Sequence, residues 1–414
     1  MATLPRSPTS TIDSTTPRML GSNQLGMREF NERVVLHAIR LHGSLPKAEL
    51  ARLTNLSTQT VSVIINRLLD EGFVLKRDSL RGRVGQPSQP IALDPDGAFS
   101  IGVQIGRRNL DVALIDFTGA PRYRKAVVYG APSVDAVFGE IGEHLERIED
   151  LLGAEKTRRI SGIGLAAPLA FGGWRELVGL SPQDADAWTR TNMRERLQRM
   201  TRLPVAFAKD TAAACVAELV AGRGRHLKNY LYVFVDTLIG GGLVVNGQPH
   251  AGVYGNAGAI GSMPLAVADS TRPGGVQQLL ASASLATLED MFAAVGLESL
   301  AAGDPRLLQA PWAPVTRRWL AEAASAIAFA INTSSCLLDL DGVIVDGAVA
   351  GPLLDALIDA VRAALGSYSW QGVMRPEIIP GAIGRDAKVI GAAYLPLHAD
   401  FAPGHESFLK AGRG

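Results

Sequence analysis

The feature that most constrains the fold of this sequence is a unit that occurs twice. Residues 99–119 contain two alternating apolar segments around Gly106, and residues 229–248 repeat the pattern around Gly240–Gly242. Apolar alternation with glycine at the bend predicts a β-hairpin in each case. A helix and a buried strand follow each hairpin. The duplication predicts two α/β lobes that face each other across a cleft.

Glycines at such bends have two interpretations. They can bring backbone N–H groups against a phosphate, or they can simply make turns. For each loop alone, turn formation is the favoured interpretation. The stretch GNAGAIGSMPL, residues 255–265, raises the same question, because it has the glycine spacing of a ligand-binding loop but neither acid nor histidine.

Length and composition indicate a soluble protein of several domains. The chain has 414 residues, 47% of them hydrophobic and 20% charged, which suits two or three domains with a sizeable core. Cys215 and Cys336 lie in apolar helix-like runs, so we expect two buried thiols in a reducing cytoplasm. The N-terminus has no apolar core of signal-peptide length. The sequence contains no run of 18 apolar residues, so we expect no membrane span.

Residues 19–93 predict a winged helix-turn-helix. A helical face precedes Gly43, Pro46 can open a short helix, and Ser57 can cap a second helix that ends near Glu71. The strand-like segments 73–77 and 90–93 flank a basic loop, which is the pattern of a wing. Residues 1–98 hold 12 Lys+Arg against 9 Asp+Glu, and the positive excess favours an anionic partner.

The second helix and the loop supply the candidate DNA contacts. Short polar side chains at a helix N-terminus suit base edges and phosphates in a major groove, and arginines in a wing often enter a minor groove. A helical hairpin that makes protein contacts is the alternative, with the loop merely solvated. The turn, the polar face and the wing together favour DNA. The candidate contacts are Ser57, Thr58, Gln59, Thr60, Ser62, Asn66, Arg67, Arg81, Gly82 and Arg83.

The chain from about residue 22 resembles the ROK family of repressors and sugar kinases. The motifs at the front are SNQLGMREFN, LPKAELARLTNLSTQTVSVIINRLLDEG and GRVGQP; those behind are IGVQIGRRNLDVALIDFTG, GIGLAAP, SPQDADAW, LPVAFAKDTAAACVAE, GGGLVVNG, GNAGAIGSMPL and IGRDAKVIGAA. The resemblance implies an α/β protein with an N-terminal winged helix-turn-helix and a two-lobed actin-like, hexokinase-like (ribonuclease H-like) ATPase fold. In the family's repressors, a sugar or partner protein bound to the second part controls the DNA-binding front.

The resemblance also implies domain boundaries. The expected segments are a disordered tail at 1–18, the winged helix-turn-helix at 19–93, a kinase-like effector and dimerisation domain at 98–400 with lobes at about 98–210 and 211–400, and a C-terminal tail at 401–414.

The phosphate-binding and catalytic positions depart from the kinase pattern. The first phosphate loop, Asp-x-Gly-Gly-Thr-Lys in the kinases, here has Gln104 for the Asp and Arg107 and Arg108 for small residues. The catalytic Asn-Asp pair is Lys209 and Asp210. A kinase needs that aspartate to accept the proton of the sugar hydroxyl. Beside a lysine, a structural role for Asp210 is the favoured interpretation.

The sugar-binding and zinc positions are also replaced. The family's Ala-Gly-Glu-Ile-Gly-His here has Ala259 for the Glu and Ser262 for the His, and Gln278 stands for a second sugar-binding Glu. The zinc cysteines align with Asp269, Thr271 and Val276. A structural zinc needs four N or S donors, so we predict no metal. The glycines of residues 255–265 are then expected to be kept for shape.

We therefore predict a cytoplasmic, non-enzymatic transcriptional regulator without a cofactor, most simply a homodimeric repressor of carbohydrate-related genes that binds a palindromic operator. The alternatives are a regulator that answers to a protein partner and an ATP-dependent sugar kinase with a DNA-binding head. The possible effector cleft comprises Gln183, Lys209, Asp210, Gly258, Ala259, Ser262 and Gln278.

Overall fold

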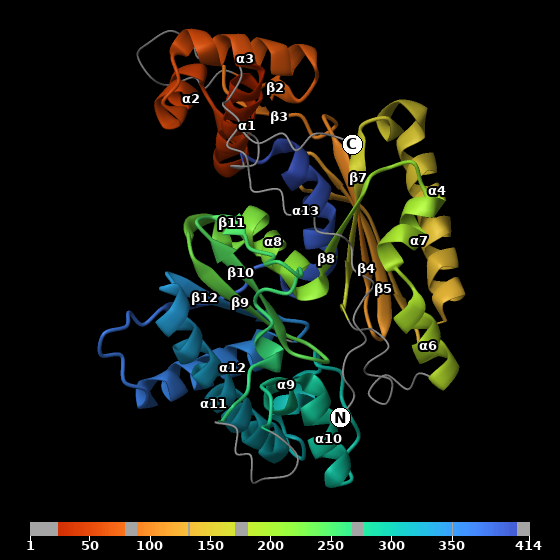
Figure 1. Cartoon of the computed structure of the whole chain (residues 1–414), viewed down its shortest axis with the longest axis vertical. Coiled ribbons are helices and arrows are strands. Elements are labelled where there is room, and N and C mark those ends of the chain that lie inside the picture. Colours follow the sequence, from red (N-terminus) through yellow and green to blue (C-terminus); the bar gives the residue numbers. More distant parts are fainter. Residues whose placement is uncertain are drawn as a thin grey trace.

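The computed structural model of the chain describes residues 24–78, 89–130, 133–169, 181–266, 276–349 and 351–403. Its strands form a three-stranded sheet in an N-terminal head and two five-stranded sheets in a larger body. The head lies at one end of the molecule, and the two lobes of the body lie below it (Figure 1). The expected α/β class, with a winged helix-turn-helix ahead of a two-lobed domain, is confirmed.

The head follows the predicted order of elements. They are α1 (Gln24–His42), β1 (Ser44–Leu45), α2 (Lys47–Thr54), α3 (Thr58–Asp70), β2 (Val74–Lys76) and β3 (Ile91–Leu93). The turn between α2 and α3 is built by Asn55, whose φ of 55° ends α2, and by Ser57, whose Oγ accepts a hydrogen bond from the N–H of Thr60 at 3.0 Å. Strand β1, which pairs with β3, is too short to show any periodicity and was not expected.

The first lobe has the strand order β6-β5-β4-β7-β8. Its elements are β4 (Phe99–Ile105), β5 (Asn109–Asp116), β6 (Pro121–Val128), α4 (Val134–Thr157), β7 (Ile160–Ala167), α6 (Pro182–Arg190), α7 (Met193–Met200) and β8 (Val205–Lys209). The first three strands are antiparallel, whereas β7 and β8 run parallel to β4. Helices α4, α6 and α7 lie on one side of this sheet (Figure 1).

The second lobe repeats this plan with the order β11-β10-β9-β12-β13. Its strands are β9 (Tyr230–Val235), β10 (Gly240–Val245), β11 (Gln248–Pro249), β12 (Gly342–Gly347) and β13 (Glu377–Pro380). Its α-helices are α8 (Asp210–Ala221), α9 (Leu280–Ala283), α10 (Leu285–Ala294), α11 (Ala313–Leu338) and α12 (Gly351–Ala364), and a further helix, α13 (Ala387–Phe401), follows them in the chain. Its short helices are η2 (Arg223–His226), η3 (Ile260–Ser262), η4 (Pro305–Leu308), η5 (Leu365–Ser367) and η6 (Gly384–Asp386). The antiparallel hairpin followed by two parallel strands therefore occurs twice.

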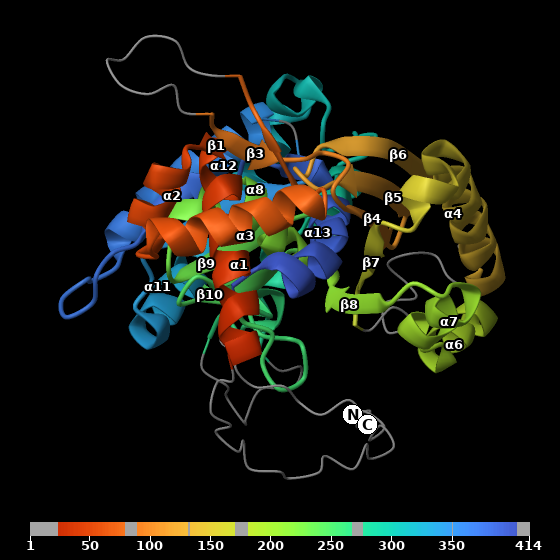
Figure 2. The same ribbon diagram turned by 90° about the horizontal axis from the view of Figure 1, so that it is seen from above.

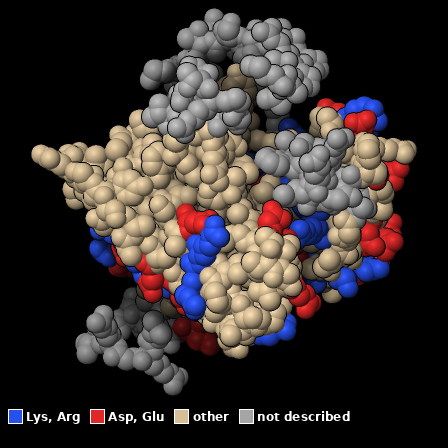
Figure 3. Space-filling model, turned by 90° about the horizontal axis from the view of Figure 1, so that it is seen from below, with Lys and Arg blue, Asp and Glu red and all other residues tan. Residues whose placement is uncertain are grey.

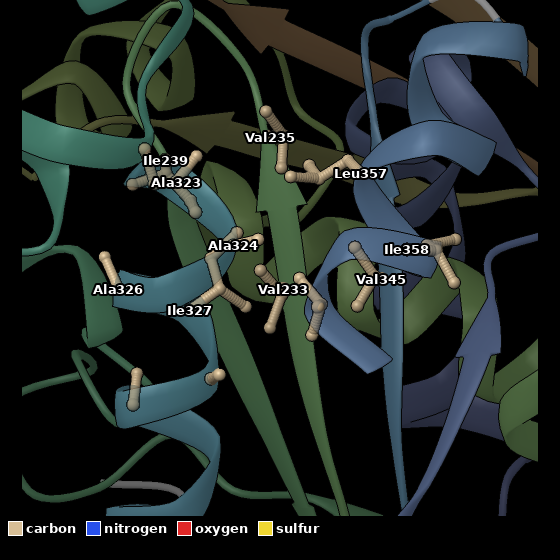
Figure 4. Packing of buried hydrophobic residues seen from close by; sticks show 14 of the residues in the cluster. Val233, Val235, Ile239, Ala323, Ala324, Ala326, Ile327, Val345, Leu357 and Ile358 are labelled. Atoms are coloured by element: carbon tan, nitrogen blue, oxygen red, sulfur yellow. The ribbon is translucent and has the colours of Figure 1, made fainter. Parts of the chain in front are cut away.

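Helix α11 packs its small and branched side chains against β9 and β12 (Figure 4). Among the described residues it is the one helix long and apolar enough to cross a membrane, but 56% of its most apolar window is buried inside the protein, as in a core helix. The expectation that Cys336 is buried is wrong. Cys336 is exposed, and its neighbour Leu337 is 81% exposed, because the two lie on the solvent-facing side of α11, while Ser334, Ser335 and Leu340 around them are buried. Cys215 is buried as expected.

Helices α8 and α13 pack closely on each other, and α13 also contacts β4 and β7 of the first lobe. Glycines make this contact possible. A Cβ at Gly391 of α13 would lie 1.8 Å from the carbonyl oxygen of Ala213, and one at Gly164 of β7 would lie 1.8 Å from that of Ala392. The last helix of the chain thus lies against the sheet of the first lobe, although the division of the lobes near residue 210 stays a prediction.

The head and the body share one continuous apolar core. Phe73 of the head lies 5.6 Å from Phe117 and 5.3 Å from Phe401, measured between ring centroids. Arg159 of the body donates hydrogen bonds to the carbonyl oxygens of Gly97, at 3.0 Å, and of Glu71, at 3.3 Å. Direct packing of this kind couples the position of the head to the arrangement of the body.

Candidate functional site

Helix α3 presents its polar face at the outer end of the head, where the views from the side and from above both place it (Figures 1 and 2). Thr58, Gln59 and Asn66 are exposed, and Ser62 is half-buried. The apolar side chains of the helix, among them Ile65, point into the core of the head. This arrangement offers short polar groups to a groove of the width of an α-helix.

Some of the predicted contact residues are already bonded to other side chains of the protein, and others are not. The hydroxyl groups of Ser57 and Thr60 bond each other at 2.8 Å, and Arg67 forms ion pairs with Glu32 at 2.9 Å and with Glu71 at 2.7 Å. These three residues therefore hold α3 in place. Asn66 accepts a hydrogen bond from Lys47 Nζ at 3.1 Å.

The side chains of Thr58, Gln59 and Ser62, by contrast, make no hydrogen bond to other described residues. They are the members of the predicted set with hydrogen-bonding groups to offer to a base. The sequence analysis missed Val63, whose side chain is 63% exposed on α3, and Lys47, whose ammonium group lies beside Asn66. An apolar residue inside the polar stretch was the available signal for Val63.

The strands of the predicted wing are present, and β2 pairs antiparallel with β3. Arg81, Gly82 and Arg83 lie outside the described residues, so their role at a minor groove stays a prediction. The opposite end of the molecule shows small mixed groups of acidic and basic side chains beside a broad uncharged area (Figure 3). Among the described residues visible in this view there is no continuous basic patch of the kind that binds a phosphate backbone.

The second candidate site is a cavity of about 150 Å³ between the lobes. Lys209, Asp210, Ala259 and Ser262 line it, as the sequence analysis grouped them. Gln183 and Gln278 do not line it, and both side chains are exposed. Gln183 lies on α6, and Gln278 forms an isolated antiparallel β-bridge with Pro264. Small-molecule sites commonly measure about 300–1,000 Å³, so this cavity is small for a sugar.

Gly258 lies behind the wall of this cavity rather than in it. Its φ is 72°, and a Cβ there would lie 2.7 Å from the backbone of Gly242 in β10. Gly261 likewise packs on Ile239, with 2.4 Å from a Cβ to the carbonyl oxygen. Gly258 and Gly261 thus let the loop lie directly on β10 and on the residue before it, which is a structural reason for keeping them without reactive groups, whereas Gly255 has open space around it and a φ of 69°.

The catalytic position Asp210 is held in a buried group of charges. Lys388 of α13, 7% exposed, lies with its Nζ 3.1 Å from Asp210 Oδ2 and 2.6 Å from Asp236 Oδ2. Burial alone would raise the pKa of each carboxyl group, but the Lys388 ammonium outweighs it, and the pKa values of Asp210 and Asp236 are lowered. A carboxylate with a lowered pKa and a bound ammonium is a poor general base.

Two arginines occupy the place of the first phosphate loop. Arg107 lines the cavity, and burial lowers its pKa against the attraction of Asp210. Arg108 reaches from the first lobe to α10 of the second, where its two Nη atoms each lie 3.0 Å from a carboxylate oxygen of Glu289. Arg107 therefore lies in the wall of the cavity, and Arg108 connects the two lobes.

The zinc positions are described only in part. Asp269 and Thr271 lie outside the described residues, while Val276 is half-buried and offers no donor. Within the described ranges no three His, Cys, Asp or Glu side chains gather as metal ligands. That the chain binds no zinc remains a prediction.

Comparison with known families agrees with this architecture. Residues 100–399 match the ROK family, and residues 30–83 match the MarR family. The first match covers most of the chain, so this protein belongs to the ROK family. The second coincides with the helix-turn-helix of the head.

Individual relatives include both regulators and enzymes. The protein y4fQ of Sinorhizobium fredii is 25% identical over 90% of this chain and 92% of its own length. The xylose repressor of Bacillus subtilis is 22% identical over 59% of this chain and 62% of its own, and the bifunctional enzyme NanE/NanK of Brucella melitensis is 33% identical over 46% and 35%.

The structure of a ROK family transcriptional regulator, a homologue of the E. coli MLC protein, superposes with a TM-score of 0.63 and 19% identity. It covers 93% of this chain and 100% of its own. The head and the actin-like, two-lobed body therefore belong to a known fold.

Proposed function

We propose that this protein is a DNA-binding transcriptional repressor of carbohydrate-related genes, controlled through a kinase-like body that no longer phosphorylates. The observation that carries the proposal is the outer face of α3, where Thr58, Gln59 and Ser62 offer hydrogen-bonding groups that no described neighbour uses. The relatives that are named as repressors support the regulatory part.

A single α3 reads too few base pairs for a specific site, so we propose a homodimer on a palindromic operator. Two-fold symmetric proteins bind half-sites about one helical turn, or about 34–36 Å, apart. Sedimentation of the purified protein, alone and with operator DNA, tests this assembly. A monomer that binds a single half-site with full specificity would contradict it.

The test of DNA binding is selection of binding sequences from a random duplex library, followed by titration of the selected operator. Gln59→Ala should weaken operator binding by about 1–3 kcal/mol and relax the preference for one base. Gln183→Ala on α6, an exposed helical glutamine far from the head, is the matched control. If no sequence is enriched, or Gln59→Ala binds like the unaltered protein, α3 is not a recognition helix.

The wing is tested in the same assay. Replacing Arg81 and Arg83 together by Ala should weaken binding to any sequence and flatten its salt dependence, because fewer counterions are released. Unchanged operator affinity in this double variant would refute the wing.

A sugar kinase is the competing function, and the kept Asp210 favours it. The ion pair of Asp210 with Lys388 and the arginine in the phosphate-loop position oppose it. A coupled ATPase assay with a panel of sugars decides the matter, since sugar-dependent turnover would overturn the regulatory proposal for the body.

The controlling signal is the remaining part of the proposal. A thermal-shift scan with sugars, sugar phosphates, sugar acids, polyols, ATP and Zn²⁺ identifies a ligand that binds the folded state. If none binds, and an affinity pull-down repeatedly recovers one protein, the body answers to a protein partner instead.

A further inference from the structure

A second cavity, of about 320 Å³, lies at the junction of the head and the body. Its walls come from α1 of the head, from α8 and η2, from the turn between β10 and β11, and from the end of α13. The volume falls within the range of small-molecule sites, and it is about twice that of the cavity between the lobes. Any molecule bound here touches the head and the body at once.

The charges of the junction cavity are all of one sign. Arg40, Arg225 and Lys228 line it with three histidines, and its described lining contains no aspartate or glutamate. Burial and the charges of His37 and Arg40 lower the pKa of His398 to about 4, so its imidazole is neutral at pH 7. The positive charge therefore comes from the two arginines and the lysine.

Arg40 is the central group. Its guanidinium lies 5.2 Å from the centroid of the Phe117 ring, and its Nη1 is buried without a hydrogen-bond partner among the described residues. The nearby carboxylate of Asp116 is already engaged, because it binds Arg122 Nε at 2.7 Å and the N–H of Thr118 at 2.9 Å. A buried guanidinium without a carboxylate of its own is costly, and an anion in the cavity that Arg40 lines would compensate its charge.

Most of the remaining wall is apolar, although Gln248 and Tyr394 also belong to it. Leu41, Leu219, Val220, Leu397 and Phe401 face the same space. We propose that the junction cavity binds a small organic anion, with an apolar body against these side chains and a carboxylate or phosphate group at Arg40. Binding stabilises one arrangement of the head on the body, because both contribute to the walls.

The experiment is isothermal titration of the full-length protein, without DNA, with phenylacetate, phenyl phosphate and the neutral phenylacetamide. At least one anion should bind, and more tightly than the amide. Arg40→Gln should weaken that anion about tenfold or more, since a charged hydrogen bond is lost. Lys228→Gln, at an exposed position, provides a second variant if Arg40→Gln does not fold.

Two controls fix the location. Arg147→Gln, on the exposed face of α4, should leave affinity unchanged. Arg107→Gln removes a charge from the cavity between the lobes and should also leave it unchanged. The proposal is overturned if neither anion binds, if the amide binds equally well, or if the affinity falls in Arg107→Gln and not in Arg40→Gln or Lys228→Gln. Because the titration contains no DNA, its outcome is independent of operator binding.

Discussion

At the scale of single residues, we expect Lys388 to contribute most to the stability of the body. It lies buried between two carboxylates that burial would otherwise make unfavourable. Removing one partner of a buried ion pair typically costs about 3–5 kcal/mol, because the other charge remains without compensation. We expect Lys388→Met to lower the free energy of unfolding by that amount in urea denaturation.

The matched control is Lys156→Met, because Lys156 Nζ lies 2.7 Å from Asp96 Oδ2 with both side chains about half exposed. An exposed ion pair of this kind contributes about 0–1 kcal/mol. Equal losses in the two variants would show that the buried position of Lys388 gives it no special importance.

The charges of Lys388, Asp210 and Asp236 make the free energy of unfolding depend on pH. Asp210 and Asp236 have lowered pKa values in the folded state, so their contribution is present above the unfolded pKa of about 4 and is lost as the pH falls through the folded values. Lys388 has a raised pKa, so its contribution is present below about pH 10 and is lost above it. The stability difference between the unaltered protein and Lys388→Met should be largest near pH 7–9 and shrink as the pH falls to 3, because the uncompensated carboxyl groups of the variant take up protons first. A difference that is unchanged at pH 3 would contradict this assignment.

The sequence favoured a structural role for Asp210, which stays a prediction, and did not indicate its partner. Lys388 lies in the last helix, inside a motif that resembles the family, and nothing in local periodicity indicates which carboxylates it meets. The burial expected for Cys336 was wrong for a related reason, because an apolar helical run does not reveal which of its residues face solvent.

At the scale of elements, the crossing of α8 and α13 holds the body together. Gly391 sits at the contact, where an added Cβ would lie 1.8 Å from the Ala213 carbonyl oxygen. Gly391→Ala should therefore force the helices apart and cost about 1–3 kcal/mol or more in chemical denaturation.

Gly139 of α4 is the matched control, because an added Cβ there meets nothing within 4 Å. Gly139→Ala should stabilise the protein by about 0.5–1 kcal/mol, the difference in helix propensity. If both substitutions stabilise, the close approach at Gly391 does not constrain the packing.

The elements themselves were largely predictable. The hairpins at 99–119 and 229–248, the cap at Ser57 and the strand before Asp210 follow from period, glycine and capping chemistry. The placement of α13 on the first lobe was not, because amphipathicity shows that a helix packs but not on which sheet. The junction cavity was hidden for the same reason, since its walls come from segments that are distant in the sequence.

At the scale of the whole molecule, the three rings of Phe73, Phe117 and Phe401 join the head to the body. Phe73→Ala should cost about 3 kcal/mol and loosen this joint. Amide hydrogen exchange in α3 should then become faster, because the head opens locally with a smaller free energy.

Phe292→Ala is the control, since Phe292 is buried in the core of the second lobe. It should speed exchange in α10 and α11 but leave α3 protected. Faster exchange in α3 with both variants would mean that the whole protein opens as one unit.

The turn at residues 94–97, which connects the head to the body, is held by hydrogen bonds to both of them. The N–H of Asp94 bonds the carbonyl oxygen of Phe73, and the N–H of Phe117 bonds that of Pro95. In a chimera that exchanges heads between relatives at this turn, the contacts between the head and the body would therefore not match. The transplanted head would need its own counterpart of Phe73, and a backbone that accepts Arg159, before it could respond to the new body.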